Sequence, residues 1–227
     1  MIQRRHALTV RVTHWINAVA LILLLMSGLQ IFNAHPSLYW GPSSYTGAGP
    51  IFELAGGFPS WLTIPGTQWL GRRWHFFFAW ILVINGLAYL IFSIATHHVT
   101  RDLAPTRSDW RSIGRSIADH LRLRHPQGEA ATRYNVLQKL SYIAVIFVLL
   151  PLMVLTGWSM SPRLDSVWPG WVDIFGGRQS ARTLHFVIAW LLVLFFFIHV
   201  FEVIVTGFWN NLRSMITGRY RIEHEQR

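Results

Sequence analysis

Long apolar segments alternate with polar ones along the chain, and the four apolar segments span residues 13–32, 74–96, 137–160 and 183–208. Each is long enough to cross the roughly 30 Å hydrocarbon core of a bilayer as a helix. The longest polar segments, 33–73 and 97–136, add no separate soluble domain. The pattern predicts an all-α membrane protein, a four-transmembrane-helix bundle forming one integral-membrane domain over residues 1–227.

The first apolar segment starts close to the N-terminus, as the hydrophobic part of a signal peptide does. No small-residue cleavage motif follows it, because the sequence continues SGLQIF. We therefore expect this segment to be retained as a transmembrane helix.

The net charge of +10 comes from arginines that are unevenly distributed. They gather before the first span (Arg4, Arg5, Arg11), within 97–136 (Arg101, Arg107, Arg111, Arg115, Arg122, Arg124, Arg133) and after the last span (Arg213, Arg219, Arg221, Arg227). Arg-rich short loops face the cytoplasm, so both termini are predicted to be cytoplasmic and the 33–73 loop external. The same arginines suit anionic lipid headgroups, and their distribution argues against a nucleic-acid partner.

The sequence contains no cysteine. Disulfides, iron–sulfur clusters, covalently attached c-type haem and thiolate metal sites are therefore excluded. Any metal chemistry must rely on histidine, methionine or oxygen ligands.

The last apolar segment carries two histidines, His185 and His199. Fourteen residues advance a helix by roughly 21 Å and leave the two side chains about 40° apart around its axis. One face therefore presents an imidazole near each edge of the hydrocarbon layer. Because ionisable groups inside a span are costly and usually functional, the pattern suggests two stacked cofactors.

Two histidines in other spans match these depths. His14 opens the first span at its cytoplasmic edge, and His75 opens the second span at its external edge. His14 can pair with His199, and His75 with His185, which is the arrangement that bis-imidazole ligation of two b-type haems requires. A lone membrane histidine can instead bond to a neighbouring helix. Pairs so far apart cannot converge on one zinc or copper ion.

Further residues are candidates for haem contacts. Gly28 lies on the face of His14 at the depth of the external pair, where a missing side chain leaves room for a porphyrin or for close helix packing. Arg11, Arg73 and Arg182 each lie within three residues of a proposed ligand. They can pair with haem propionates, or reach toward the headgroups as arginines at helix ends do.

A polar cluster at the cytoplasmic start of the third span is a candidate quinone site, formed by Tyr134, Asn135, Gln138 and Lys139. Glu202 is the one carboxylate within a span and lies one turn from His199. It is a candidate for delivering protons to quinone, with a salt bridge to an arginine as the alternative.

The loops carry weaker patterns. The external loop is rich in aromatic residues that suit the interface or a docked partner, and a short helix is expected at 60–70. The pattern of apolar and charged residues over 108–122 predicts an amphipathic helix on the inner membrane surface. Pro151 is expected to kink the third span. The other histidines, expected at the surface, are His6, His35, His97, His98, His120, His125 and His224.

The chain resembles the bacterial di-haem cytochrome b561 and nickel-hydrogenase-type cytochrome b family in the stretches RVTHWINAV, LYWG, RRWHFFFAW, RYNVLQKLSY and RTLHF with HVFEVIVTG. The fourteen-residue spacing of the last two histidines is the most specific element. The resemblance implies His14 and His199 as ligands of an inner haem, and His75 and His185 as ligands of an outer one. It also implies the bacterial inner membrane, and electron flow between a periplasmic redox subunit and the quinone pool. The LYWG, YNVLQKL and MITG segments are similar to cytochromes that accompany sulfite-oxidase-like molybdopterin proteins.

These patterns predict an electron conduit in which electrons enter at the outer haem and reduce quinone at the inner one; the reverse direction uses the same parts. One alternative is a self-sufficient superoxide:quinone oxidoreductase, which needs an open basic funnel near Arg72 and Arg73 rather than an aromatic loop. Another is a structural anchor for a periplasmic enzyme, which does not need matched histidines.

Overall fold

Helices dominate the computed structural model, which describes residues 2–44, 49–122, 134–168 and 170–221, and for 119–121 only the backbone. Four helices in the described residues are long and apolar enough to cross a membrane: Leu8–Phe32 (α1), Gln68–Ala95 (α2), Val136–Ser159 and Arg178–Val205 (α7). The predicted fold class, all-α with four membrane-length helices, is confirmed.

The ends of α7 differ from the predicted span because backbone contacts decide them. The N–H groups of Gln179 and Ser180 donate to the carbonyl of Gly41, at 3.1 and 3.3 Å. This loop carbonyl satisfies donors of the first turn that have no partner within the helix, so α7 begins at Arg178 rather than 183. It ends near Gly207, whose φ of 105° is left-handed.

The third long helix is interrupted near its middle. It consists of α4 (Val136–Ala144), a π-helical turn (Val145–Leu149) and α5 (Leu150–Ser159). Pro151, where a kink was expected, lies in the first turn of α5 directly after the π-helical turn. Proline has no N–H to donate, and a local widening of the helix accommodates this loss.

The other elements are short: β1 (Ile2–Arg4), β2 (Ser37–Leu38), β3 (Phe52–Glu53), the 3₁₀ turn η1 (Ser60–Leu62), the π-helical η2 (Val99–Leu103), α3 (Arg107–Leu121), α6 (Pro162–Val167), the 3₁₀ turn η5 (Val172–Phe175), α8 (Phe208–Thr217) and β4 (Arg219–Arg221). The helix α3 matches the amphipathic helix predicted at 108–122. The helix expected at 60–70 is limited to η1, because Pro65 and Gly66 follow and separate it from α2.

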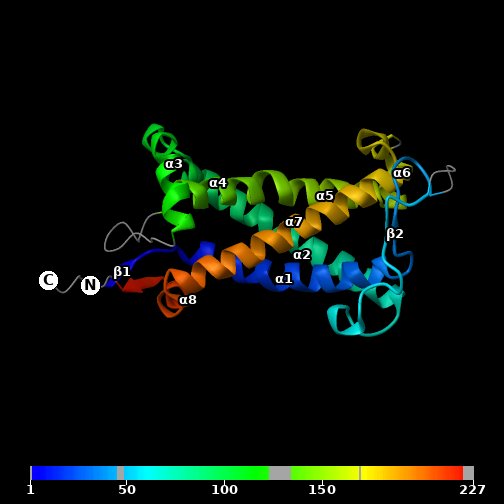
Figure 1. The fold of residues 1–227 in the computed structure, drawn as a ribbon, viewed down its shortest axis with the longest axis horizontal. Coiled ribbons are helices and arrows are strands. Elements are labelled where there is room, and N and C mark those ends of the chain that lie inside the picture. Colours follow the sequence, from blue (N-terminus) through cyan, green and yellow to red (C-terminus); the bar gives the residue numbers. More distant parts are fainter. Residues whose placement is uncertain (1, 45–48, 123–133, 169, 222–227) are drawn as a thin grey trace. The chain divides into compact units, whose positions relative to one another are not determined.

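The chain divides into two compact units, and the first comprises Met1–Trp15, Gly86–Val148 and Val193–Arg227. In this unit β1 pairs antiparallel with β4, with Gln3 opposite Tyr220 (Figure 1). The indole Nε1 of Trp15 donates to the carbonyl of Met215 at 3.1 Å. These contacts join the two terminal segments to each other and the start of α1 to α8.

The second unit comprises Ile16–Asn85 and Leu149–Leu192. The strands β2 and β3 pair antiparallel within it. Arg182 donates from Nη1 to the carbonyl of Ser37 at 3.0 Å, and Thr183 donates from Oγ1 to the carbonyl of Tyr39 at 2.7 Å. The segment that follows α1 is therefore tied to the first turns of α7.

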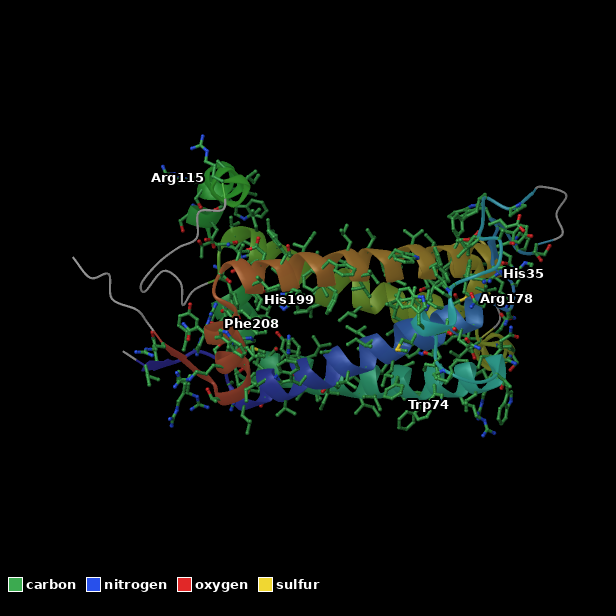
Figure 2. The ribbon with its side chains drawn as sticks, turned by 60° about the horizontal axis from the view of Figure 1, so that its bottom comes forward. His35, Trp74, Arg115, Arg178, His199 and Phe208 are labelled. Carbon is green, nitrogen blue, oxygen red and sulfur yellow. The ribbon has the colours of Figure 1, made fainter. Side chains whose placement is uncertain are left out.

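Burial is distributed as lipid-facing helices require. Large apolar side chains of α2 point outward, and Trp80, Ile91 and Ile94 are 61%, 69% and 74% exposed. Side chains surround the long helices on their outer surfaces in the same way, as at Trp74 on α2 (Figure 2). The most completely buried side chains are mostly small hydroxyls, Ser27, Ser93, Thr156, Ser180 and Ser214. Small residues let helices approach closely where no hydrophobic effect drives association.

Candidate functional site

The first histidine pair joins α1 to α7. The ring centroids of His14 and His199 lie 6.2 Å apart, with the ring planes at 57°. Phe195 stacks on His199 at 5.7 Å, and Trp15 meets His14 edge-on at 5.2 Å. The ring of Tyr142, from α4, lies 6.4 Å from His199. Aromatic side chains therefore surround this pair, and Figure 2 marks His199 on α7.

The second pair joins α2 to α7. The ring centroids of His75 and His185 are also 6.2 Å apart, with the planes at 64°. The hydroxyl oxygen of Ser27, on α1, lies 3.0 Å from His75 Nδ1. The hydroxyl oxygen of Thr156, on α5, lies 3.0 Å from His185 Nδ1. Each ring of this pair thus contacts a hydroxyl from a further helix.

The spacing of both pairs fits two imidazoles on one iron. A metal–imidazole bond is about 2 Å long and the ring centre lies about 1 Å beyond the nitrogen, so two such rings have centroids about 6 Å apart. The observed 6.2 Å agrees with this value at both pairs. Because a b-type haem supplies four nitrogens of its own, two protein ligands complete its iron.

Other metals fit less well. In the described part of the chain, no three His, Cys, Asp or Glu side chains come together as a potential metal site. Zinc needs three or four protein ligands, whereas each pair here offers two. The donor set therefore suits haem iron.

Two glycines lie against the second pair. A Cβ built on Gly28 would lie 3.4 Å from His75 Cε1, so its missing side chain makes room for the histidine ring itself. Gly157 has the same relation to His185 Cε1, at 3.3 Å. Gly157 and both hydroxyls were not among the candidate residues expected from the sequence. The signal was present, because Ser27–Gly28 and Thr156–Gly157 repeat one hydroxyl–glycine dipeptide in two spans.

Each of the three arginines that were candidates for binding haem propionates contacts another residue of the chain. Arg11 donates from Nη1 to the carbonyl of Ile216. Arg182 donates to the carbonyls of His35 and Ser37. Arg73 is exposed, and its guanidinium lies over the Trp69 ring at 3.6 Å. Arg73 thus stacks on an aromatic ring, whereas the other two arginines donate to backbone carbonyls.

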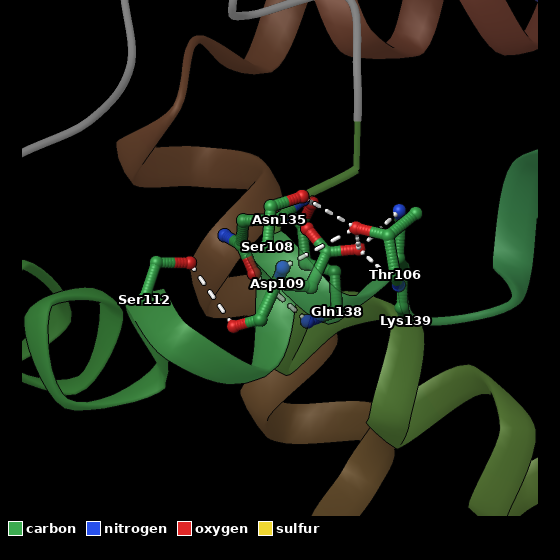
Figure 3. A network of polar contacts seen from close by, with 7 residues as sticks. All are labelled: Thr106, Ser108, Asp109, Ser112, Asn135, Gln138 and Lys139. Carbon is green, nitrogen blue, oxygen red and sulfur yellow. Dashed lines mark hydrogen bonds and ion pairs between the residues drawn. The ribbon is translucent and has the colours of Figure 1, made fainter.

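The polar cluster at the start of α4 forms a helix cap and an ion pair (Figure 3). The Asn135 side chain accepts from the N–H of Gln138 at 2.9 Å, and the Gln138 side chain accepts from the N–H of Asn135 at 3.2 Å. This reciprocal arrangement is a capping box. Lys139 forms a 2.9 Å salt bridge with Asp109 of α3. The hydrogen bond from the N–H of Thr106 and, to a smaller extent, the bridge to Lys139 hold the pKa of Asp109 below its usual value.

Tyr134 lies near the first pair through an aromatic contact. Its ring is 5.4 Å from that of Tyr142, which in turn contacts His199. The Tyr134 hydroxyl is 3.5 Å from Nδ1 of His6, and burial raises the pKa of Tyr134. Glu202 belongs to α7, three residues after His199, and its backbone carbonyl accepts from Thr206 Oγ1 at 2.6 Å.

Comparison with known proteins gives a family match over most of the chain. Residues 5–218 match the family described as prokaryotic cytochrome b561. The chain belongs to this family. It is 31% identical to a putative protein-methionine-sulfoxide reductase subunit, YedZ1, of Azospira oryzae, over 94% of this chain and 96% of the relative. It is 26% identical to a probable Ni/Fe-hydrogenase B-type cytochrome subunit of Cupriavidus necator, over 92% and 83%.

As a prokaryotic cytochrome b561, the chain is a multi-pass membrane protein of the b-type, haem-binding class. Its remaining histidines lie outside the two pairs. His35 and His97 are exposed as predicted, and His98 bonds to Asp102 at 2.6 Å. The predictions for His125 and His224, and for the side chain of His120, fall outside the described residues.

The prediction that His6 lies at the surface is wrong, because His6 is only 9% exposed. Its backbone lies beside Gly218, and the next residue back, Arg5, donates its N–H to the Gly218 carbonyl at 2.9 Å. The pairing of β1 with β4 therefore buries His6, although this residue follows a short basic segment in the sequence. Burial and the neighbouring Arg5 lower the pKa of His6 to about 4.

Proposed function

We propose that this cytochrome holds two b-type haems, one between His14 and His199 and one between His75 and His185, and carries electrons across the inner membrane. The observation that carries the proposal is the ring separation of 6.2 Å at each pair. Bound haem iron would supply reversible one-electron transfer. The four histidines would hold the haems through their imidazole nitrogens, and the apolar helices around them would exclude water.

The partner we propose is a catalytic oxidoreductase subunit on the periplasmic side. Both relatives are named as subunits, one of a reductase and one of a hydrogenase. On the external loop, Trp40 and Trp61 are 58% and 75% exposed, which suits a docked protein. Arg73 lies on Trp69, which does not favour the open basic funnel that superoxide would need. A sulfite-oxidase-like molybdopterin protein is the partner class to test first.

The direction we propose is from quinol to this partner, opposite to the direction expected from the sequence. Reduction of methionine sulfoxide consumes electrons, and the relative named for that reaction has the higher identity. A hydrogenase partner would deliver electrons instead. Both directions use the same two histidine pairs.

We propose that quinone binds in the region beside the His14–His199 pair. Tyr134 is a donor connected to that pair through Tyr142, and Glu202 lies one turn from His199. Asn135 and Gln138, which also remain candidates, serve the helix cap as well. The cytoplasmic placement of both termini, which puts this region on the inner side, rests on the arginine distribution.

The test is a haem-to-protein ratio on the purified chain, with reduced-minus-oxidised spectra of the wild type, His75→Ala and His14→Ala. We expect two low-spin b haems in the wild type and the loss of a different one in each variant. The control is His35→Ala, which changes an exposed histidine outside the pairs and should keep both haems. One haem or none in the wild type would overturn the proposal. In the assembled complex, His199→Ala should abolish quinone-linked turnover; unchanged turnover would make the chain a structural anchor.

A further inference from the structure

The hydroxyl of Ser27 has only one proton, and the acceptors around its oxygen show where this proton points. Ser27 Oγ lies 2.6 Å from the carbonyl oxygen of Leu23 and 3.1 Å from that of Leu24, and both can only accept. The hydroxyl therefore donates into its own helix. The remaining contact, to His75 Nδ1 at 3.0 Å, must then be donated by the imidazole. His75 carries its proton on Nδ1 and its free lone pair on Nε2.

The same reasoning applies to Thr156. Its hydroxyl lies 2.7 Å from the carbonyl oxygen of Leu152 and 3.2 Å from that of Met153, so it donates along α5. His185 Nδ1, 3.0 Å from Thr156 Oγ1, is therefore a donor as well. Both histidines of this pair have the Nδ1–H tautomer, which leaves Nε2 available to a metal.

The two hydroxyls are built into the helices that carry them. Both side chains are 0% exposed, so water does not compete for the imidazole N–H. In each case the following residue is glycine, and its absent Cβ lets the ring approach. A hydroxyl that fixes the proton and a glycine that admits the ring thus occur together at both histidines.

The His14–His199 pair has a different environment. Nδ1 of His14 is buried and has no hydrogen-bond partner within the described residues. The neighbours of this pair are the rings of Trp15, Phe195 and Tyr142. The hydroxyl–glycine arrangement therefore distinguishes one pair from the other.

We infer that Ser27 and Thr156 are positioning residues for the haem of the His75–His185 pair. They fix the tautomer and the orientation of both ligands and increase the basicity of each imidazole through the Nδ1–H bond. The inference rests on the proposed function, because it assumes that a haem binds between these rings. It assigns a role to two residues that bind neither haem nor substrate.

The experiment removes each hydroxyl at nearly constant volume, with Ser27→Ala, Thr156→Val and the double variant. Both midpoint potentials are measured by optical redox titration, and haem affinity by titration of the apo-protein. We expect the potential of the His75–His185 haem to rise, since a less basic imidazole stabilises the oxidised iron less. The affinity of that site should fall roughly 10- to 100-fold in the double variant. The potential of the other haem should not change.

Conservative variants and a matched control separate positioning from packing. Ser27→Thr and Thr156→Ser keep the hydroxyl and should restore the wild-type potential. Ser159→Ala removes another buried hydroxyl of α5, which donates to the Thr156 carbonyl at 2.7 Å, and should shift neither potential. Hydroxyl-free variants with unchanged potential and affinity would overturn the inference, as would equal shifts at both haems. If the wild type bound no haem at this pair, the proposed function would fail instead.

Discussion

The two histidine pairs have the same ring separation, 6.2 Å, but different surroundings. His75 and His185 are each held by a buried hydroxyl and lie against a glycine. Around His14 and His199 the contacts are aromatic, and Nδ1 of His14 has no partner among the described residues. The same ring separation is thus held by directional hydrogen bonds at the His75–His185 pair and by ring packing at the His14–His199 pair.

The difference extends to the segments that support each pair. The hydroxyls and glycines of the His75–His185 pair belong to α1 and to α5, which is part of the third long helix. The His14 end of α1 is instead joined to α8, through Trp15 with Met215 and Arg11 with Ile216. We therefore expect the His75–His185 pair to be sensitive to small changes within the helices. The other pair should depend more on the terminal segments.

The largest effect should come from filling the glycine positions. In Gly157→Val and Gly28→Val, the added Cβ would lie 3.3 or 3.4 Å from a histidine ring, and the extra methyls would lie closer still. Overpacking of this kind costs about 1–3 kcal/mol, equivalent to roughly a 5- to 150-fold loss of haem affinity at that pair. Haem content and reduced-minus-oxidised spectra of the purified variants measure it.

The matched control for this prediction is Gly86→Val, on α2, where an added Cβ meets nothing within 4 Å. It should retain both haems. Loss of the His14–His199 haem from the Gly28 or Gly157 variants would show that the two pairs are not supported independently. That result would remove the basis of the comparison.

The sequence was sufficient for the features that follow from hydropathy and helical periodicity. Each of the four spans is apolar over the length needed to cross a bilayer, and this property was enough to predict them. The pairing of His14 with His199 and of His75 with His185 was proposed from depth alone, and the structure brings these rings together. Depth follows from the position of a residue along its span, so no side-chain detail was needed.

Features that depend on contacts between distant segments were not predictable in this way. The start of α7 at Arg178 depends on the carbonyl of Gly41, and the burial of His6 depends on β1 pairing with β4. The helix α8, which follows the left-handed Gly207, lies where the sequence indicated only arginines after the last span. Gly157 could have been found from its dipeptide, but only the fold shows which histidine it faces.

The next effect is on folding stability rather than on haem affinity, and it is expected at the left-handed glycines that lie outside the two pairs. Gly177 has a φ of 100°, and a Cβ there would lie 2.5 Å from Cα of Pro42. Gly177→Ala should therefore cost about 3 kcal/mol, because the strained backbone adds to a contact that cannot relax. The apparent unfolding temperature should fall by roughly 5 to 10 °C.

Gly207→Ala provides the matched comparison, since Gly207 has a φ of 105° but an added Cβ meets nothing. Its cost should be about 1 kcal/mol, the backbone strain alone. Gly177 belongs to the unit of the His75–His185 pair, and Gly207 to the other unit. Equal destabilisation by the two variants would contradict the tight contact between Gly177 and Pro42.

The smallest effect concerns pH and the segment that supports His14. The pKa of His6 is about 4 in the folded protein, lowered from 6.5 by burial and by Arg5. Between these values the unfolded chain binds a proton that the folded protein does not, so stability is full above pH 6.5 and declines as the pH falls toward 4. His6→Gln should reduce this decline by on the order of 2 kcal/mol, because glutamine does not titrate. His35→Gln, at an exposed position in the other unit, should leave it unchanged. Unfolding temperatures from pH 4 to 7.5 measure both, and identical pH profiles for His6→Gln and the wild type would show that the pairing of β1 with β4 does not keep His6 buried.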